Sequence, residues 1–437
     1  MTVQPTPASS GIAGKHNEAS AIVAQMTLEE KVAFASGRSF WHLQACERLD
    51  VPAVMVTDGP HGLRKQSSGG DHVGLNKSVP ATCFPTACAL AASWDPDLLQ
   101  EIGVALGEQC VAEDVTVLPG PGMNIKRHPL CGRNFEYFSE DPLLNGQLAA
   151  ALVNGVQSQG VGTSIKHFAV NNQEYGRMFV DAIVDERTLR EIYLRGFEIA
   201  VKASQPWTVM CAYNRLNGVY CSEHDWLLNQ VLRDEWGFQG LVMTDWGAAN
   251  DRVLGVGSGL DLEMPGGSDS NTLRLQQAVR DGRMPEAALD RAVVRNVSLA
   301  LCGRELADRQ VDLDQQAHHQ LARRAAAESS VLLKNEDDLL PLNSTARIAL
   351  IGEFARRPRY QGTGSSQVRP TQLDCAHDAI RDLLGDAGEL FYADGYEPVY
   401  SEADSVLIEQ AVAAAVQADV AVVFAGLPVT YESEGFD

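Results

Sequence analysis

Between about Leu28 and Leu301, short apolar runs alternate with longer stretches of helical periodicity, and this alternation limits the possible folds more than any other feature. It predicts repeated βα units around a parallel sheet. The strand-like runs are Ala53–Val56, Ala87–Ala92, Val115–Leu118, Gly162–Ile165, Thr208–Ala212, Leu241–Met243 and Leu260–Leu262. The helical stretches include Asp97–Ala112, Leu143–Gln159, Glu186–Ala203 and Trp226–Trp236. About seven strands come close to the eight of a (β/α)8 barrel, and an open doubly wound sheet is the alternative.

Polar side chains follow nearly every strand-like run. They are Asp58, Asn124, Lys166 with His167, Tyr213 with Asn214, Asp245 with Trp246, and Glu263. A (β/α)8 barrel gathers its chemistry at the carboxyl ends of all its strands, whereas an open sheet concentrates it at one switch point. The spread of polar groups therefore favours the barrel.

The remaining sequence predicts a second α/β domain. Residues 1–25 form an N-terminal extension, residues 26–303 the (β/α)8 TIM-type barrel, and residues 304–325 a polar interdomain linker with some helix. Residues 326–437 read as an αβα sandwich domain that is incomplete at the C-terminus. A layered α/β domain needs roughly 100 to 150 residues and several strands, and the final apolar run leads directly into an acidic loop at Asp437.

Charge and composition indicate a small, neutral ligand. The formal net charge is -22, so the chain has little basic surface for nucleic acid or an anionic membrane. No apolar run reaches the ~18 to 20 residues that span a bilayer, and the N-terminus lacks an export pattern, so we expect a cytoplasmic protein. The nine cysteines include no C-x-x-C pair and are expected to be reduced. Homo-oligomerisation is left open.

Two acidic positions suggest glycoside chemistry. In GLVMTDWGA an apolar strand presents Asp245 beside Trp246, and an indole ring can stack on the apolar face of a sugar. Glu432 and Glu434 follow the last apolar run, in TYESEGFD. Glycoside hydrolysis needs two carboxyl groups, one ionised and one protonated. The structural alternatives are a helix cap for Asp245 and a solvated acidic tail for the glutamates.

The segment SIKHFAVNNQEYGR is unusually polar for the end of a strand. It contains Lys166, His167 and Arg177, whose donors suit a polyhydroxylated ligand. Lys166 also raises a rival function, because a barrel lysine can form a Schiff base with a carbonyl substrate, as in a lyase. The structural alternative is that Lys166 is a surface lysine and His167 a structural histidine. The histidines lack metal-ligand spacing, so we expect neither a metal nor another cofactor.

Three loops supply further polar candidates. TDGPHGLRK offers Asp58 and Arg64, and LCGRNFEYFSEDP offers Arg133 in an aromatic-rich loop. An aspartate can bridge neighbouring sugar hydroxyls and an arginine can orient them, although turn chemistry and a surface ion pair explain these residues equally well. QGTGSSQV lacks the spacing of a phosphate loop and is expected to reach a neighbouring domain.

Taken together, these motifs resemble glycoside hydrolase family 3, β-glucosidase branch. The resemblance runs from about Met26 to the last residue. It is carried by TDGPHGLR, GRNFEYFSEDP, KHFAVNNQE, VMTDWGA, SSVLLKNEDDLLPL, GTGSS and ESEGFD, in that order. The family implies a barrel followed by an αβα sandwich with the active site between them. It also implies a retaining exo-β-glycosidase, most simply a β-glucosidase that acts by double displacement through a glycosyl-aspartate.

The resemblance also implies a role for each matched residue. Asp245 matches the nucleophile and Glu434 the acid/base of the second domain, with Glu432 the less favoured neighbour. The sugar subsite is matched by Asp58, Arg64, Arg133, Lys166, His167, Arg177, Met210, Tyr213, Trp246, Ser365 and Ser366. A retaining mechanism needs carboxyl groups ~5 Å apart, so the two domains would have to close on each other.

The chain departs from the family pattern in two places. KHFAVNN replaces the KHFPGHG-like loop of the β-N-acetylglucosaminidase branch, which disfavours that branch. Family members continue beyond the acid/base loop, so we expect a missing C-terminal segment. A truncated, weakly active or inactive sugar-binding remnant is therefore the alternative function. Among substrates, β-glucosides, β-xylosides and α-arabinosides are not separated by sequence.

Overall fold

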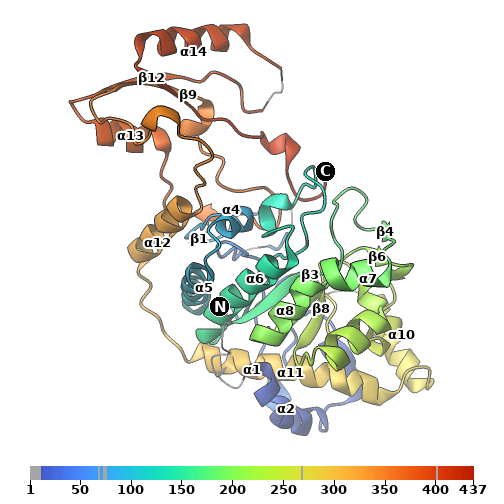
Figure 1. Cartoon of the computed structure of the whole chain (residues 1–437). Helices are drawn as coiled ribbons and strands as arrows, with labels where there is room; N and C mark the ends of the chain where they lie inside the picture. The colour runs from blue at the N-terminus through green and yellow to red at the C-terminus, as the bar shows by residue number, and fades with distance from the viewer. Residues whose placement is uncertain (1–10, 67–68, 72–75, 267–268, 400–401) are drawn as a thin grey trace.

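The computed structural model describes residues 11–66, 69–71, 76–266, 269–399 and 402–437, and within them the fold is mixed α/β (Figure 1). Of the predicted N-terminal extension, residues 1–10 lie outside the described residues. Residues from Gly11 onward form α1 (Gly11–Gly14) and α2 (His16–Val23), which pack on the long helix α11 (Glu286–Ala307). We call residues 11–307 the first lobe and residues 330–437 the second lobe.

The first lobe is built around a four-stranded parallel sheet. Its strands follow one another in chain order: β2 (Val117–Leu118), β3 (Gly162–Phe168), β5 (Thr208–Cys211) and β8 (Leu241–Thr244). All four are completely buried, as expected for a parallel sheet covered on both faces. Four of the predicted strand-like runs thus overlap these strands, although β3 and β8 extend past the runs predicted for them.

The other three runs differ from prediction. Val56 and Leu262 each contribute a single parallel bridge at opposite edges of the sheet, to Val117 and Met243, rather than a full strand. Ala87–Ala92 is the helix α4, so its prediction as a strand was wrong. The run is mostly alanine, which has the highest intrinsic helix propensity, and Thr86 precedes it in extended conformation. Its apolar character reflects burial, not strand structure.

Three helices stack in a row along the sheet. They are α5 (Pro96–Ala112), α6 (Pro142–Ser158) and α8 (Arg195–Ser204), and α6 packs against both of the others (Figure 1). Asp95 and Asp141 cap α5 and α6 by accepting two backbone N–H groups each, and a proline follows each cap. These helices confirm the predicted stretches 97–112 and 143–159. The stretch 186–203 is α7 (Glu186–Thr188), the π-helix η3 (Leu189–Tyr193) and α8.

The remaining first-lobe elements are short or peripheral. The helices are α3 (Leu28–Phe34), α9 (Arg252–Gly257), α10 (Asp269–Arg280), the π-helix η5 (Trp226–Glu235), and the 3-10 turns η1 (Glu47–Leu49), η2 (Asn134–Glu136) and η4 (Cys221–Glu223). A second small sheet contains β4 (Asp181–Ala182), β6 (Arg215–Leu216) and β7 (Val219–Tyr220).

The second lobe has a smaller parallel sheet and its own core. Its strands lie in the order β11 (Glu389–Ala393), β9 (Arg347–Ile351) and β12 (Val420–Val423). The helices are α13 (Ala376–Leu384) and α14 (Ser405–Gln417), with the 3-10 turns η6 (Glu336–Asp338), η7 (Glu353–Ala355) and η8 (Val429–Tyr431). Ala349, Ala393 and Ala414 form the buried centre of this lobe.

The two lobes contact each other at several points. Strand β1 (Pro80–Ala81) of the first lobe pairs in parallel with β10 (Arg369–Pro370) of the second, and Val368 is buried in the first-lobe core. Helix α12 (Gln315–Glu328), which begins halfway along the predicted linker, packs on α4 and α5. The chain end returns to the boundary between the lobes (Figure 1). These contacts place second-lobe loops over the carboxyl ends of the main-sheet strands.

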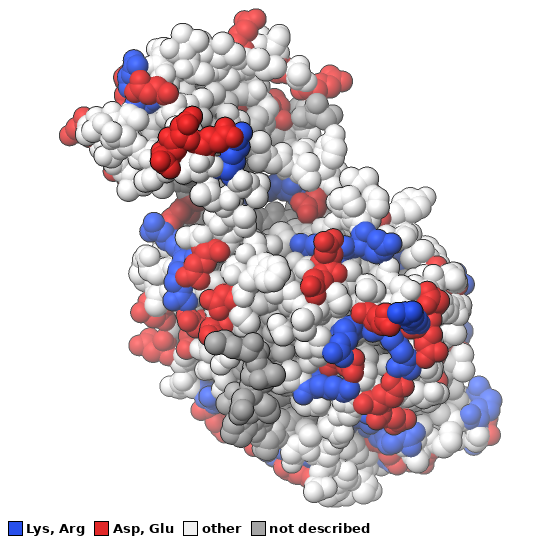
Figure 2. Space-filling model, viewed as in Figure 1, with Lys and Arg blue, Asp and Glu red and all other residues white. Residues whose placement is uncertain are grey.

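Charged side chains of both signs are interspersed on the face of the molecule in Figure 2, which agrees with the absence of a single basic patch there. Within the residues that the structure describes, no helix is long and apolar enough to cross a membrane. All nine cysteines are free thiols.

Candidate active site

The predicted polar residues of the first lobe gather at the carboxyl ends of the main-sheet strands. The buried members of this cluster are Asp58, Arg64, Arg133, Lys166, His167, Tyr213, Asp245 and Trp246, with Arg177 at its margin. They come from five separate segments of the chain, so the parallel arrangement of β3, β5 and β8 is what brings them together.

Asp245 lies directly after β8, where its own backbone N–H still bonds to Cys211 of β5. Its Oδ1 accepts the N–H of Trp246 at 2.7 Å, and its Oδ2 lies 3.5 Å from Nε2 of His167. The cap of the next helix, α9, is Asp251. The helix-cap reading of Asp245 is therefore wrong, and its carboxylate faces the cluster.

Lys166 is fully buried and paired with two carboxylates. Its Nζ lies 3.1 Å from Oδ1 of Asp58 and 3.3 Å from Oε1 of Glu136. Burial favours the neutral amine, but the charges of Asp58 and Glu136 outweigh it and raise the pKa of Lys166. A Schiff base requires a neutral amine. The ion pairs therefore argue against the rival lyase function.

Glu136 is a buried partner that sequence reasoning missed. Its Oε2 lies 2.7 Å from Nη2 and 2.8 Å from Nε of Arg133. Burial raises the pKa of Glu136, but Arg133 and Lys166 lower it by more. The signal was present in GRNFE, where the two residues are three apart around the turn η2. Glu136 thus holds Arg133 and Lys166 side by side.

His167 is neutral in this setting. It is fully buried, and burial together with the nearby charges of Arg133, Lys166 and Arg177 holds the pKa of its imidazole well below the usual range. The pairing of β3 with β5 shifts register between Ile165 and Phe168. Such an irregularity re-aims side chains, here at the strand end that carries Lys166 and His167.

Arg64 is buried against Asp58, with 3.9 Å between Nη1 and Oδ2. Its guanidinium also reaches Asp71, whose carbonyl and carboxylate accept from it at 3.0 to 3.2 Å. Asp71 in turn accepts from the side chain of Gln66 at 2.9 Å and from the backbone of Asn76 at 2.6 Å. Asp71 is therefore a second residue that sequence reasoning missed, and it ties Arg64 to the loop that follows it.

Tyr213 and Trp246 flank Asp245. The hydroxyl of Tyr213 donates to the carbonyl of Trp246 at 3.1 Å, and the guanidinium of Arg177 lies 4.7 Å from the centre of the Tyr213 ring. The Trp246 ring packs on Trp41, with 5.1 Å between ring centres, and its Nε1 donates to the carbonyl of Phe40 at 2.8 Å. Trp246 is thus fixed in place.

Glu434 reaches this cluster from the second lobe. Its Oε1 accepts from Nη1 of Arg177 at 2.9 Å and lies 3.7 Å from Nη1 of Arg133. The backbone N–H of Ser365 donates to its Oε2 at 2.6 Å. The side chain of Glu434 is only 9% exposed, so the solvated-tail reading of this residue is wrong.

Asp437 fastens the acidic loop to the first lobe. Its carboxylate accepts three backbone N–H groups, from Gly132, Glu174 and Tyr175, at 2.9 to 3.0 Å. Glu174 reciprocates, because its Oε2 accepts the N–H of Gly435 and also pairs with Arg177, both at 2.8 Å. These bonds fix the loop that carries Glu434.

The other second-lobe and core candidates have different surroundings. Glu432 pairs with Arg359 at 3.0 Å within its own lobe. Ser365 meets Glu434 through its backbone, and the buried hydroxyl of Ser366 has no hydrogen-bond partner among the described residues. Met210 lies in β5 opposite Met243, inside the core.

The two carboxyl groups differ in their electrostatics. Burial raises the pKa of Asp245, and the charge of Glu434 raises it further, while Arg133, Arg177 and Lys166 oppose the rise. Burial also acts to raise the pKa of Glu434, but Arg133, Arg177 and the bonds from Ser365 outweigh it, so its pKa lies well below the usual range. In the ligand-free site Glu434 is thus held ionised by Arg177.

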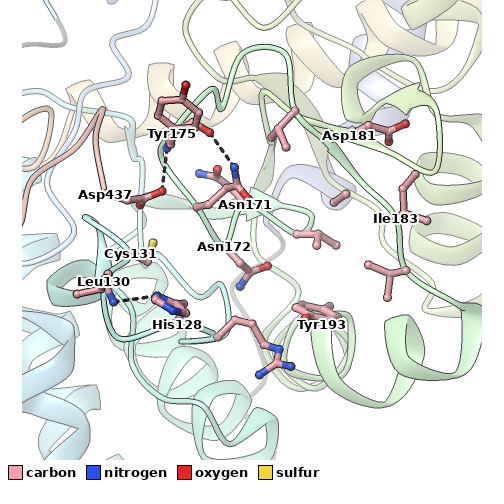
Figure 3. A pocket seen from close by; sticks show the side chains of 16 residues that line it. His128, Leu130, Cys131, Asn171, Asn172, Tyr175, Asp181, Ile183, Tyr193 and Asp437 are labelled. Carbon is pink, nitrogen blue, oxygen red and sulfur yellow. Dashed lines mark hydrogen bonds between the residues drawn. The ribbon is translucent and has the colours of Figure 1, made fainter.

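A cavity of about 700 Å³ lies beside the cluster, and Figure 3 shows its lining. Asn171, Asn172 and Tyr175 form one wall, and Asp437, Cys131 and His128 form another (Figure 3). Neither Asp245 nor Glu434 lines it. The cavity therefore adjoins the site and is not the site itself. Among the described residues, no group of His, Cys, Asp and Glu is arranged to hold a metal ion.

Family models match both lobes. The model described as "Glycosyl hydrolase family 3 N terminal domain" matches residues 15–299, and that described as "Glycosyl hydrolase family 3 C-terminal domain" matches residues 330–437. The chain is 56% identical over 416 residues to thermostable beta-glucosidase B of Acetivibrio thermocellus, covering 95% of this chain and 55% of that protein. It is 49% identical over 429 residues to an exo-alpha-(1->6)-L-arabinopyranosidase of Bifidobacterium breve, covering 95% and 56%.

Solved structures are similar as well. The structure of a GH3 beta-glucosidase of Bifidobacterium adolescentis superposes with a TM-score of 0.87 at 49% identity, covering 95% of this chain and 59% of that one. Beta-glucosidase 3B of Thermotoga neapolitana, in complex with alpha-D-glucose, has a TM-score of 0.85 at 36% identity, covering 96% and 64%. The chain spans about half the length of the curated relatives it matches.

Proposed function

This chain belongs to glycoside hydrolase family 3, and from that premise we propose that it is a retaining, exo-acting β-glycosidase, most simply a β-glucosidase. Its substrate would be the terminal non-reducing β-D-glucosyl residue of a glycoside. The reaction would proceed by double displacement through a glycosyl-enzyme ester on Asp245.

One observation carries this proposal: the same two arginines act on both the Asp245 carboxylate of the first lobe and the Glu434 carboxylate of the second. Arg133 and Arg177 of the first lobe both face Glu434 of the second, and both act on the pKa of Asp245. A retaining glycosidase needs two carboxyl groups on opposite sides of one glycosidic bond. A purely structural role would not require the carboxylates of Asp245 and Glu434 to be buried together with three cations. These cations are Arg133, Arg177 and Lys166.

In the proposed mechanism, a carboxylate oxygen of Asp245 attacks the anomeric carbon while Glu434 protonates the departing oxygen. Glu434, now ionised, then takes a proton from water, which attacks the ester and releases the sugar. The second step uses the ionised form of Glu434 that Arg177 favours. The first step requires Glu434 to be protonated, so Arg177 must loosen its hold when substrate enters.

We also propose the finer fold implied by the family, a (β/α)8 barrel over residues 26–303, a linker over 304–325 and a partial αβα sandwich over 326–437. Backbone hydrogen bonds support the barrel, because they continue past both edges of the main sheet. Glu263, which follows the Leu262 that bridges to β8, exchanges bonds with residues 35 and 37, and residues 41 and 43 bond to 56 and 54. Residue 55 accepts from 116, at the start of β2.

The sugar would be held by the cluster around Asp245. Asp58 and Lys166 form a buried pair whose remaining lone pairs and protons suit sugar hydroxyls, and Arg64, Arg133, Arg177 and His167 add donors. Met210, Tyr213, Trp246, Ser365 and Ser366 would complete the subsite, as the family resemblance implies. The alternative, an inactive sugar-binding remnant, is less supported because Glu434 and Asp437 are both firmly bonded to the first lobe.

A second candidate specificity is an α-L-arabinopyranoside. The relative from Bifidobacterium breve, 49% identical, is named for that activity. The cluster itself does not distinguish the two sugars, since its donors and acceptors suit the hydroxyls of either pyranoside. Comparing kcat/KM on 4-nitrophenyl β-D-glucopyranoside and 4-nitrophenyl α-L-arabinopyranoside decides between them.

The proposal is tested by trapping the intermediate. The 437-residue chain is incubated with an activated 2-deoxy-2-fluoro-β-glucoside, which slows hydrolysis of the glycosyl-enzyme, and its intact mass is measured. We expect a one-sugar adduct that maps to Asp245 and is missing in Asp245→Asn. An adduct on another residue would contradict the nucleophile assignment. A folded chain that gives no adduct with this probe or its arabinosyl analogue would contradict the proposed activity.

A further inference from the structure

A buried tyrosine next to His167 is not explained by sugar binding. Tyr137 and His167 are each 1% exposed, and the hydroxyl of Tyr137 lies 3.1 Å from Nδ1 of His167. On its other side, Nε2 of His167 lies 3.5 Å from Oδ2 of Asp245. His167 therefore bridges Tyr137 and the proposed nucleophile, one ring nitrogen facing each.

The direction of the hydrogen bonds follows from the neighbours of Tyr137. Nδ2 of Asn171 lies 3.4 Å from the Tyr137 hydroxyl and 3.5 Å from Oε1 of Glu174. An amide nitrogen can only donate, and it is the nitrogen that must face the Glu174 carboxylate. The Tyr137 oxygen thus accepts from Asn171, and its single proton is left to point at Nδ1 of His167.

Asn124 is the competing partner of the imidazole. Its Oδ1 lies 3.4 Å from Nδ1 of His167 but already accepts the backbone N–H of the same histidine at 2.9 Å. Its Nδ2 donates to the carbonyl of His167 at 2.8 Å, which fixes the orientation of the amide. If Nδ1 carried the proton, it would donate to Asn124, and a bare Nε2 lone pair would face the Asp245 carboxylate.

We propose that Tyr137 is a positioning residue that keeps His167 in the Nε2–H tautomer, so that His167 donates a hydrogen bond to the carboxylate of Asp245. The inference rests on the proposed function, because it assigns His167 to support of the nucleophile. Because His167 is neutral, its tautomer decides whether it stabilises or repels an ionised Asp245. The hydroxyl of Tyr137 selects between the Nδ1–H and Nε2–H tautomers of His167.

Other groups also act on Asp245 and must remain constant in a test. From the first lobe these are Lys166, Arg133, Arg177 and Tyr213, and from the second lobe Glu434. Replacing Tyr137 by phenylalanine keeps the ring and leaves all of these groups in place. Loss of the donor at Oδ2 would disfavour the carboxylate, so the pKa of Asp245 would rise.

Nitrogen-15 NMR of imidazole-labelled protein reads the tautomer directly, in the ligand-free chain. The His167 signals are assigned by their loss in His167→Gln. We expect Nε2 of His167 to be protonated and Nδ1 bare in the unaltered chain, and Tyr137→Phe to move the population toward Nδ1–H. The acid limb of kcat should then move to higher pH by roughly one unit, as expected for loss of one hydrogen bond to a charged group.

The control is Tyr392→Phe, which removes a hydroxyl that donates to Asp394 in the second lobe and should change neither readout. An Nδ1–H tautomer in the unaltered chain would overturn the proposal even if Tyr137→Phe failed to fold. A shifted tautomer with an unmoved acid limb would overturn it too, since His167 would then not support Asp245. Failure of the proposed function is seen separately, as absence of turnover in the unaltered chain.

Discussion

Arg177 of the first lobe and Glu434 of the second form an ion pair across the lobe boundary, with 2.9 Å between Nη1 and Oε1. The same Nη1 of Arg177 also lies 2.8 Å from Oε2 of Glu174, and Glu174 accepts the backbone N–H of Gly435, next to Glu434. Arg177 thus fixes the place of the proposed acid/base, and together with Arg133 it favours the ionised form of Glu434. Docking of the lobes and assembly of the site are therefore one event.

Glu434→Gln should lower kcat/KM far more for glucosides with poor leaving groups than for those with good leaving groups. Alkyl glucosides need protonation of the departing oxygen, so their kcat/KM should fall by roughly 10² to 10⁴, whereas dinitrophenyl glucoside should lose much less. The measurement is kcat/KM across a series of aglycones, with added azide to attack the sugar in place of water.

The matched control is Glu432→Gln, two residues away, which loses an ion pair with Arg359 inside the second lobe. It should keep the same dependence on leaving group as the unaltered chain. Equal losses on all aglycones in Glu434→Gln, or a leaving-group dependence in Glu432→Gln, would assign the acid/base elsewhere.

Gly364→Ala should displace the side chain of Glu434 while leaving its carboxyl group unaltered. Gly364 has φ +107°, which side-chain-bearing residues rarely adopt, and an added Cβ would lie 2.6 Å from both Cβ and Oε2 of Glu434. Since Ser365, the next residue, donates its N–H to Glu434, the acid should be displaced. We expect the alkyl glucosides to lose activity preferentially, as in Glu434→Gln.

Gly385→Ala controls for backbone strain, because Gly385 also has positive φ but its Cβ would meet nothing within 4 Å. It should lower the melting temperature of the second lobe and leave the leaving-group dependence unchanged. The same kinetic change in both variants would mean that strain, and not contact with Glu434, is responsible.

Glu136→Gln should destabilise the first lobe. Glu136 is buried between Arg133 and Lys166, so removing its charge leaves two buried cations short of a partner. Breaking such a buried pair costs about 3 to 5 kcal/mol. The exposed pair Arg190–Glu235 provides the control, and Glu235→Gln should cost less than about 1 kcal/mol. Urea unfolding at pH 7 compares them, and equal costs would contradict a special role for Glu136.

The sequence predicted those parts of the fold that depend on continuous local patterns. The runs that became β3, β5 and β8 are buried on both faces, so they stand out as uninterrupted apolar segments. Ala87–Ala92 was mistaken for one of them because a short buried helix and a buried strand have the same apolar composition. Full strands were predicted at Val56 and Leu262, but an apolar residue can lie at a sheet edge and form only a single bridge.

Residues of the site could be predicted only where a single sequence motif identifies them. Asp245 follows its strand directly, and the paired motifs resemble a known family, so these residues were named in advance. Glu136, Asp71 and Tyr137 were not, although two of them lie in a quoted motif. Their importance depends on partners that the fold supplies, such as Lys166 for Glu136 and His167 for Tyr137, each 30 residues away along the chain. Spacing within a motif cannot reveal such partners.

Arg177→Met should move the whole pH profile of kcat to higher pH. Arg177 stabilises the ionised forms of both Glu434 and Asp245, and so lowers both pKa values. Turnover of bound substrate needs Glu434 protonated, which sets the alkaline limb of kcat, and Asp245 ionised, which sets the acid limb of kcat. Without the charge of Arg177 both pKa values rise, so both limbs move up, whatever the loss in absolute rate from weaker sugar binding.

Arg177→Lys keeps the positive charge and should hold both limbs nearer their original positions, although the loss of the fork geometry will lower the rate. Profiles from pH 4 to 9 on a slow alkyl glucoside measure both limbs together. A rise of the alkaline limb alone would mean that Arg177 acts on Glu434 but is shielded from Asp245. Limbs that stay fixed in Arg177→Met would contradict control of the acid/base by this ion pair, and Arg133, at 3.7 Å from Glu434, would then be the residue to change.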